Sequence, residues 1–130
     1  MNQYIEWINR AKSDFKFASV TIEEGMYYED SCFHSQQAVE KAFKGLLIYH
    51  GVEPAFTHDI GYLLIEIEKL MEIDELIKQS KYLTKYAVST RYPGPYNDVS
   101  IEEHQKALII AKNCIDWVEK KIEDASKLNV

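Results

Sequence analysis

Apolar residues recur at steps of three and four along most of the chain, and this spacing restricts the fold more than any other feature. Such steps place apolar side chains on one face of an α-helix, whereas strands need alternation at every second residue. No segment of the sequence combines sustained alternation with β-branched residues. The clearest stripe comprises Ile5, Ile8, Ala11, Phe15, Ala18 and Ile22. The pattern therefore predicts an all-α protein.

Residues that begin and end helices divide these stripes into segments. We predict helices over residues 3–24 and 30–50, the second closed by Gly51. A third helix should begin after an N-cap at Thr57, and a fourth after Asp74. The apolar positions of the fourth helix are Leu76, Ile77, Leu83 and Ala87.

A last helix is predicted to begin where Ser100 and Glu103 form a capping-box pattern. Its apolar stripe extends to Ile122. Four to five helices of such lengths, joined by short connections, predict an up-and-down bundle of antiparallel neighbours. The length of 130 residues fits one domain, so we expect residues 1–130 to form a single helical domain.

Composition and charge exclude several classes of protein. Hydrophobic residues make up 46% and charged residues 28% of the chain, which is typical of globular proteins. Its apolar runs are too short to span a bilayer, and no signal peptide is visible, so we expect a cytoplasmic protein. The net charge of −6 disfavours broad electrostatic binding to nucleic acid, although a local basic site could still engage a nucleotide or short RNA.

The sequence shows no pattern of residues that would hold a metal or a cofactor. Cys32 and Cys114 lie far apart and belong to no CxxC or Cys/His motif, so we expect them to be small buried residues. No His, Asp or Glu pair has the spacing of metal ligands, and no glycine-rich phosphate loop occurs.

The predicted helix over residues 30–50 carries a polar stripe. His34, Gln37, Lys41 and Lys44 are spaced three, four and three residues apart, so they share one face. Glu40 precedes Lys44 by four residues and could pair with it. One interpretation is an ordinary solvated helix face, and the other is a stripe that attracts phosphate groups.

A second candidate lies at the start of the predicted third helix. Asp59 falls in its first turn, where unpaired N–H groups stabilise a carboxylate. His58 beside it could carry a proton near neutral pH. Alternatively, Asp59 only caps the helix and His58 hydrogen-bonds to a neighbouring loop.

A third candidate is a stiff segment before the last helix. The run Pro93-Gly94-Pro95 limits its conformational freedom. Arg91 offers a charged fork suited to phosphate, and Tyr92 and Tyr96 offer rings on which a base could stack. Alternatively, Arg91 caps the preceding helix and the tyrosines cover the core. Since the chain has only one other arginine, Arg10, a loop arginine beside two prolines is informative.

Taken together, four segments in order resemble the HEPN family (higher eukaryotes and prokaryotes nucleotide-binding). These segments are AKSDF (11–15), FHSQQAVEKAFK (33–44), THDI (57–60) and TRYP (90–93). The resemblance implies a helical bundle that often dimerises and is often encoded beside a minimal nucleotidyltransferase as a toxin–antitoxin pair. It also implies a possible activity, since active members of the family are metal-independent endoribonucleases with an Arg-x4–6-His motif.

This sequence departs from the Arg-x4–6-His pattern. Counted from Arg91, the positions that could hold the histidine are Tyr96, Asn97 and Asp98, and the next histidine, His104, lies thirteen residues on. The arginine carries over from the family and the catalytic histidine does not.

Three functions are therefore to be distinguished. The first is binding of a nucleotide or RNA around Arg91 and His58 by a homodimer that works with a nucleotidyltransferase. Other residues expected at this site are Gln37, Lys41, Lys44, Asp59, Tyr92 and Tyr96. The second is metal-independent RNA cleavage by Arg91 with His58 or Tyr96. The third is a non-catalytic protein-interaction module. None of the three requires a cofactor, a metal or a membrane.

Overall fold

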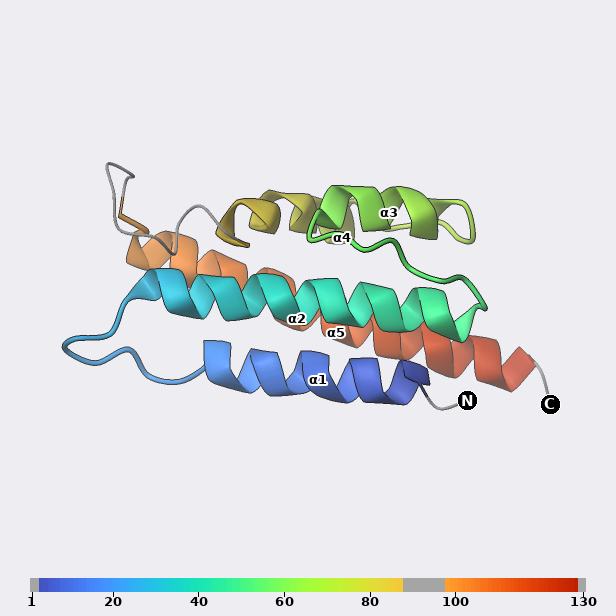
Figure 1. The fold of residues 1–130 in the computed structure, drawn as a ribbon, viewed down its shortest axis with the longest axis horizontal. Helices are drawn as coiled ribbons and strands as arrows, with labels where there is room; N and C mark the ends of the chain where they lie inside the picture. Colours follow the sequence, from blue (N-terminus) through green and yellow to red (C-terminus); the bar gives the residue numbers. More distant parts are fainter. Residues whose placement is uncertain (1–2, 88–97, 129–130) are drawn as a thin grey trace.

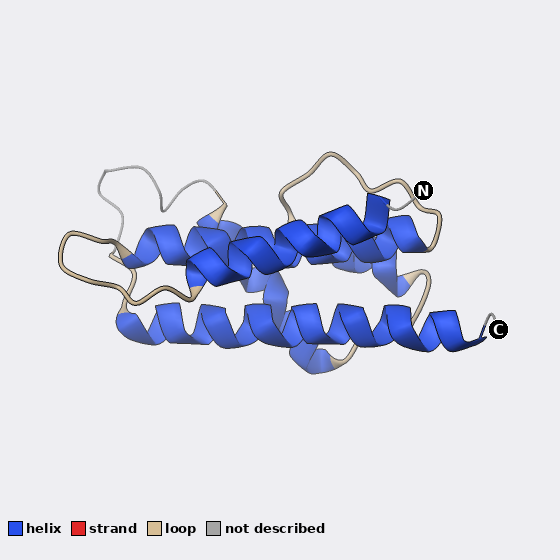
Figure 2. Cartoon of the chain, turned by 90° about the horizontal axis from the view of Figure 1, so that it is seen from below, coloured by secondary structure: helices blue, strands red, loops and turns tan. Residues whose placement is uncertain are grey.

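The computed structural model describes residues 3–87 and 98–128, and every regular element in them is helical (Figure 2). The elements are α1 (Gln3–Ala18), α2 (Tyr28–Tyr49), α3 (Ile60–Glu68), α4 (Glu75–Lys78), the 3-10 helix η1 (Gln79–Tyr86) and α5 (Ile101–Leu128). The predicted all-α class is confirmed.

The long segments alternate in direction along the chain, as Figure 1 shows. α1 runs antiparallel to α2, the α4–η1 segment runs back, and α5 again runs in the direction of α2. α2 contacts α1, α3, η1 and α5, so it is the central element of the bundle. This arrangement confirms the predicted up-and-down bundle, with the short α3 as an addition between α2 and α4. In the described part of the chain, no helix is both long and apolar enough to cross a membrane.

α1 ends at Ala18, six residues before the predicted end at Glu24. Three consecutive β-branched residues follow in the segment Val20-Thr21-Ile22, and their restricted side chains disfavour a helix. The hydroxyl of Ser19 also donates a hydrogen bond to the carbonyl oxygen of Phe15, at 2.8 Å. The prediction of a helix through residue 24 was therefore wrong, and the residues after Ala18 form a loop to α2.

The ends of α2 and α3 are set by local hydrogen bonds. After α2, the N–H of Gly51 donates to Ile48 and that of Val52 to Leu47, a Schellman motif that uses the positive φ of 79° at Gly51. At the start of α3 the N-cap is Asp59 rather than the predicted Thr57. The Thr57 hydroxyl instead accepts a hydrogen bond from the N–H of Asp59 at 3.0 Å.

The predicted fourth helix is divided into the single turn α4 and the longer 3-10 helix η1. The buried residues of this segment are Ile77, Ser80, Leu83 and Tyr86, each three after the last. A 3-10 helix has three residues per turn, so this spacing suits it better than an α-helix. Leu76, which was expected on the apolar face, is exposed.

The core lies between α2 and the helices around it. Its largest fully buried apolar side chains are Phe43, Leu46, Leu47, Ile60, Leu63 and Ile67. Cys32 and Cys114 are free and buried, as expected from their isolation in the sequence. One of the two hydrogen bonds of the predicted capping box before α5 is present, because the N–H of Glu103 donates to the Ser100 hydroxyl at 3.1 Å.

Candidate functional site

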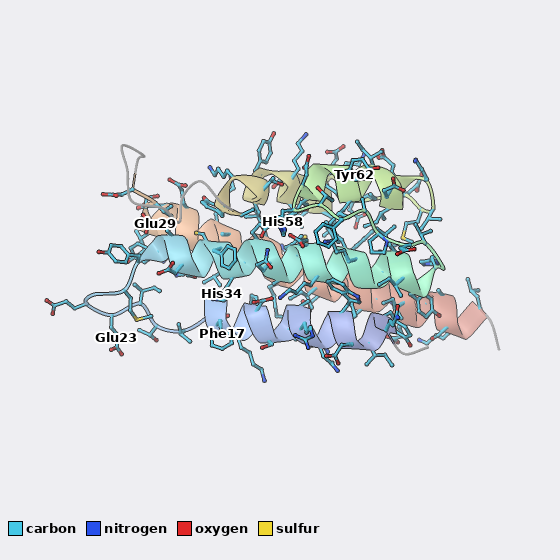
Figure 3. The ribbon with its side chains drawn as sticks, viewed as in Figure 1. Phe17, Glu23, Glu29, His34, His58 and Tyr62 are labelled. Atoms are coloured by element: carbon cyan, nitrogen blue, oxygen red, sulfur yellow. The ribbon has the colours of Figure 1, made fainter. Side chains whose placement is uncertain are left out.

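The most concentrated polar cluster of the described residues is built around the carboxylate of Glu40 in α2. The side chain of Glu40 is only 5% exposed. Its Oε1 lies 2.9 Å from Nδ1 of His58, in the loop before α3, and its Oε2 lies 3.0 Å from Nζ of Lys44. Figure 3 shows His58 over the middle of α2. One buried carboxylate therefore links a helix lysine to a loop histidine.

Two glutamines complete this cluster. Nε2 of Gln36 donates to Oε1 of Glu40 at 3.2 Å and to the backbone oxygen of His58 at 3.1 Å. Nε2 of Gln37 donates to Oε1 of Gln36 at 2.8 Å and to Oε1 of Glu40 at 3.3 Å. Because Gln36 bonds both the carboxylate and the backbone beside the histidine, it fixes the loop against α2. We call the set Gln36, Gln37, Glu40, Lys44 and His58 the Glu40 cluster.

The Glu40 cluster presents one ring edge of His58 to solvent. An ionised carboxylate only accepts hydrogen bonds, so Nδ1 of His58 carries the hydrogen and Nε2 is the free nitrogen. The side chain of His58 is 63% exposed, and among the described residues its ring hydrogen-bonds through Nδ1 to Glu40. Lys44 already balances the charge of Glu40, so a proton on Nε2 would place a net positive charge at the surface. The arrangement can bind an anion or exchange a proton.

A second cluster lies toward the end of α1 and has the same composition of charged groups. Asp14 is buried, and its Oδ1 lies 3.0 Å from Nδ1 of His34 while its Oδ2 lies 2.6 Å from Nζ of Lys41. The ring of His34 is stacked on that of Phe17 with 5.3 Å between centroids. Figure 3 shows Phe17 and His34 at the same end of α1. This cluster fastens α1 to α2.

The polar stripe predicted on α2 is therefore divided between two partners. Gln37 and Lys44 contact Glu40, whereas His34 and Lys41 contact Asp14 of α1. The expected pair of Glu40 with Lys44 is confirmed, but it is buried rather than exposed. Two members of the stripe thus contact a carboxylate of α2 itself and two contact α1, and the structure does not bring Lys41 into the Glu40 cluster.

Asp59 follows His58 directly but has a different role in the structure. Its Oδ1 accepts hydrogen bonds from the N–H groups of Gly61 at 2.9 Å and Tyr62 at 3.4 Å, so it caps α3. Its place as a ligand-binding residue stays a prediction. Arg91, Tyr92 and Tyr96, the other residues predicted for the site, lie outside the described residues.

His104, the first histidine after Arg91, is buried near the start of α5. Its Nδ1 lies 3.0 Å from the hydroxyl of Ser31, which donates to the backbone oxygen of Ala18 at 2.7 Å. The hydroxyl oxygen is therefore the acceptor and Nδ1 the donor. Burial lowers the pKa of His104 below its ordinary value of 6.5. Within the described residues, His104 is therefore a buried ring held by the hydroxyl of Ser31.

The central role of Glu40 and the part played by Asp14 were both missed by sequence reasoning. A signal was present for Asp14, because it lies at helical spacing from Ala11 and Ala18 on the apolar stripe of α1. A carboxylate on a core-facing stripe must find partners when it is buried. Within the described residues, no group of three or more His, Cys, Asp or Glu side chains could hold a metal ion.

Comparison with known proteins places the chain in a family. The HEPN domain model matches residues 4–121. The "Putative toxin MJ1304" of Methanocaldococcus jannaschii is 29% identical, over 91% of this chain and 87% of that protein.

Two crystal structures have the same fold. TT1696 from Thermus thermophilus is 31% identical and has a TM-score of 0.81, over 93% of this chain and 99% of that one. The archaeal HEPN homologue ST0689 is 31% identical and has a TM-score of 0.71, over 92% of this chain and 97% of that one. The resemblance seen in the four sequence segments is thereby confirmed, and the chain belongs to the HEPN domain family.

Proposed function

We propose that this HEPN protein binds a nucleotide or RNA through phosphate contacts at His58 and Arg91. The observation that carries the proposal is the 2.9 Å contact between Nδ1 of His58 and the buried carboxylate of Glu40. This contact fixes the ring, so its exposed edge is oriented before any ligand arrives. A preoriented group loses little conformational freedom on binding, which favours affinity.

The lysine and glutamines of the Glu40 cluster act mainly through position. Lys44 is buried and bonded to Glu40, so it offsets the buried charge of the carboxylate that orients His58. Gln37 holds Glu40 from the other side. Arg91 adds a planar guanidinium that can bond two phosphate oxygens, and Tyr92 and Tyr96 add rings for base stacking.

The protein is proposed to work as a toxin-type homodimer with a minimal nucleotidyltransferase as its partner, in the cytoplasm. Membership of the HEPN family and the name given to the relative MJ1304 support this role. Light scattering of the purified protein tests the dimer, and co-purification with the product of a neighbouring nucleotidyltransferase gene tests the partner. A monomer at all concentrations would contradict the first.

Titration with a short fluorescent RNA tests the binding site. His58→Ala and Arg91→Ala should each weaken binding by about tenfold, which is typical for loss of one charge-assisted phosphate contact. Lys16→Ala is the matched control, because it removes an exposed cation of α1 outside the cluster. If wild type does not bind RNA or nucleotides, or if all three variants bind as wild type does, the proposal is wrong.

A metal-independent endoribonuclease is the second candidate, and the Glu40–His58 contact favours it as well. A carboxylate that holds Nδ1 of a histidine leaves Nε2 free to take a proton from a hydroxyl, as a general base does. In this function Arg91 would stabilise the charge that develops on phosphate, with Tyr96 as an alternative proton carrier. RNA cleavage in the presence of a chelator should then be lost in His58→Ala, and cleavage unchanged in that variant and in Arg91→Ala would exclude the mechanism.

A further inference from the structure

A pocket of about 630 Å³ opens between the start of α1 and the loop that joins α2 to α3. Its lining residues are Gln3, Trp7, Lys44, Ile48, Gly51, Val52, Glu53, Pro54, Ala55 and Phe56. Pockets for small ligands usually measure about 300–1,000 Å³ and combine apolar walls with a few polar groups. The volume and the lining of this pocket fit that description.

One wall of the pocket depends on a close approach of α1 to α2 at Gly45. A Cβ atom on Gly45 would lie 2.8 Å from Cδ1 of Ile8 and 3.3 Å from Cβ of Trp7. The absence of a side chain there lets Trp7 lie against α2, with its ring centroid 5.7 Å from Nζ of Lys44. The close approach of the two helices thus places the indole in the wall of the pocket.

Phe56 also lines the pocket, and its large apolar side chain is fully exposed. An aromatic ring held in water without a packing partner has apolar surface available for a ligand. Trp7 and Phe56 therefore give the pocket two aromatic groups, the arrangement by which proteins bind flat bases. Gln3 and Glu53 add an amide and a carboxylate that can hydrogen-bond to the edge of a base.

The pocket adjoins the Glu40 cluster. Lys44 lines the pocket and also bonds Glu40, and Phe56 precedes His58 by two residues in the same loop. A ligand in the pocket would therefore contact Lys44, a member of the Glu40 cluster, and lie against the loop that carries His58.

We infer that this pocket binds the base of a nucleotide whose phosphate contacts His58. The base stacks on Trp7 and Phe56, and an exocyclic amino group, as in adenine or cytosine, donates to the carboxylate of Glu53. This inference rests on the proposed function and adds to it the position of the base. The two parts of the ligand are then recognised by different residues, so they can be tested separately.

Trp7 itself supplies the signal for a binding experiment. The chain has two tryptophans, and in a Trp117→Phe background the emission reports on Trp7 alone. Three probes are titrated: AMP, adenosine and ribose 5-phosphate. AMP and adenosine should quench the emission in a saturable way, and ribose 5-phosphate should not.

Substitutions then separate the base from the phosphate. Phe56→Ala should weaken AMP and adenosine alike, by about tenfold for the loss of one stacking contact. His58→Ala should weaken AMP but leave adenosine unchanged. Phe17→Ala, at an exposed phenylalanine of α1 outside the pocket, is the matched control. Since Phe56 is fully exposed, its removal should leave the circular dichroism spectrum and the melting temperature unchanged.

Failure of the pocket and failure of the proposed function give different results. If Phe56→Ala binds AMP as tightly as the Trp117→Phe parent while His58→Ala binds it less tightly, the pocket assignment is wrong and the phosphate site stands. The pocket assignment is also wrong if RNA binds and AMP causes no saturable quenching. If neither RNA nor any nucleotide binds, both are wrong.

Discussion

Nδ1 of His58 lies 2.9 Å from Oε1 of Glu40, so a histidine in a loop is held by a carboxylate buried in the central helix. The contact spans 18 residues of sequence and joins the loop before α3 to α2. Because the other oxygen of Glu40 bonds the buried amine of Lys44, the carboxylate serves both the stability of α2 and the orientation of His58.

Glu40→Ala should therefore destabilise the protein strongly. The substitution leaves the ammonium group of Lys44 buried without a counter-charge, and such a loss usually costs about 3–5 kcal/mol in the free energy of unfolding. Adding Lys44→Met should recover most of that loss, because both charges are then gone. Urea unfolding of the single and double variants measures both effects.

An exposed pair provides the control for Glu40→Ala. Oδ2 of Asp116 lies 2.7 Å from Nζ of Lys112, with both side chains more than half exposed. Asp116→Ala should cost less than about 1 kcal/mol, because water screens the pair. If Glu40→Ala costs no more than Asp116→Ala, then the carboxylate of Glu40 does not stabilise the buried ammonium group of Lys44.

Asp59 allows a test of its capping role at the start of α3. Its carboxylate caps α3 through the N–H groups of Gly61 and Tyr62, so Asp59→Ala should lower the free energy of unfolding by about 1 kcal/mol. Asp59→Asn should be nearly neutral, since asparagine caps equally well. Thermal unfolding measures both. Equal stability of wild type and Asp59→Ala would show that the cap contributes nothing.

The fold followed from periodicity wherever a helix packs along one continuous stripe. The stripe of α1 and the glycine after α2 were enough to predict those elements. The errors arose where local chemistry competes with the pattern. In α1, β-branched residues after Ala18 end the helix although Ile22 continues the spacing. In η1, burial at every third residue favours the tighter 3-10 helix. Apolar steps of three also occur in α-helices, so the pattern does not distinguish a 3-10 helix from an α-helix.

The candidate site was only partly predictable for a different reason. Helical spacing shows which residues share a face, but it does not show which element packs on that face. Gln37 and Lys41 share the stripe of α2, yet Gln37 contacts Glu40 of the same helix and Lys41 contacts Asp14 of α1. The contact of His58 with Glu40 joins segments far apart in sequence, and only the packing of the loop on α2 brings them together.

The two cysteines should be nearly inert in the folded protein. Burial raises the pKa of Cys32 to about 12, with the carboxylates of Glu103 and Glu29 as lesser causes, and burial raises that of Cys114 to about 12. The thiolate fraction is then about a thousandfold below that of an ordinary thiol, and the thiolate is the reactive form. Ellman's reagent at pH 8 should label neither until guanidinium is added. Ser126→Cys, at an exposed position of α5, is the control that should react at once, and rapid labelling of the native wild type would contradict the prediction.

His104 should make the stability of the protein depend on pH. Burial lowers its pKa below 6.5, so between these two values the unfolded chain binds a proton that the folded chain does not. The contribution of His104 to the free energy of unfolding is therefore fully present above about pH 6.5 and is lost as the pH falls toward the lowered value. Urea unfolding at pH 7.5 and pH 5.5 measures this loss. His104→Asn should reduce it, because an asparagine amide can still donate to Ser31 but does not titrate. His50→Asn is the matched control for loss of an exposed histidine. An equal loss of stability in wild type and His104→Asn would mean that acid acts through other groups, since His104 is the residue removed.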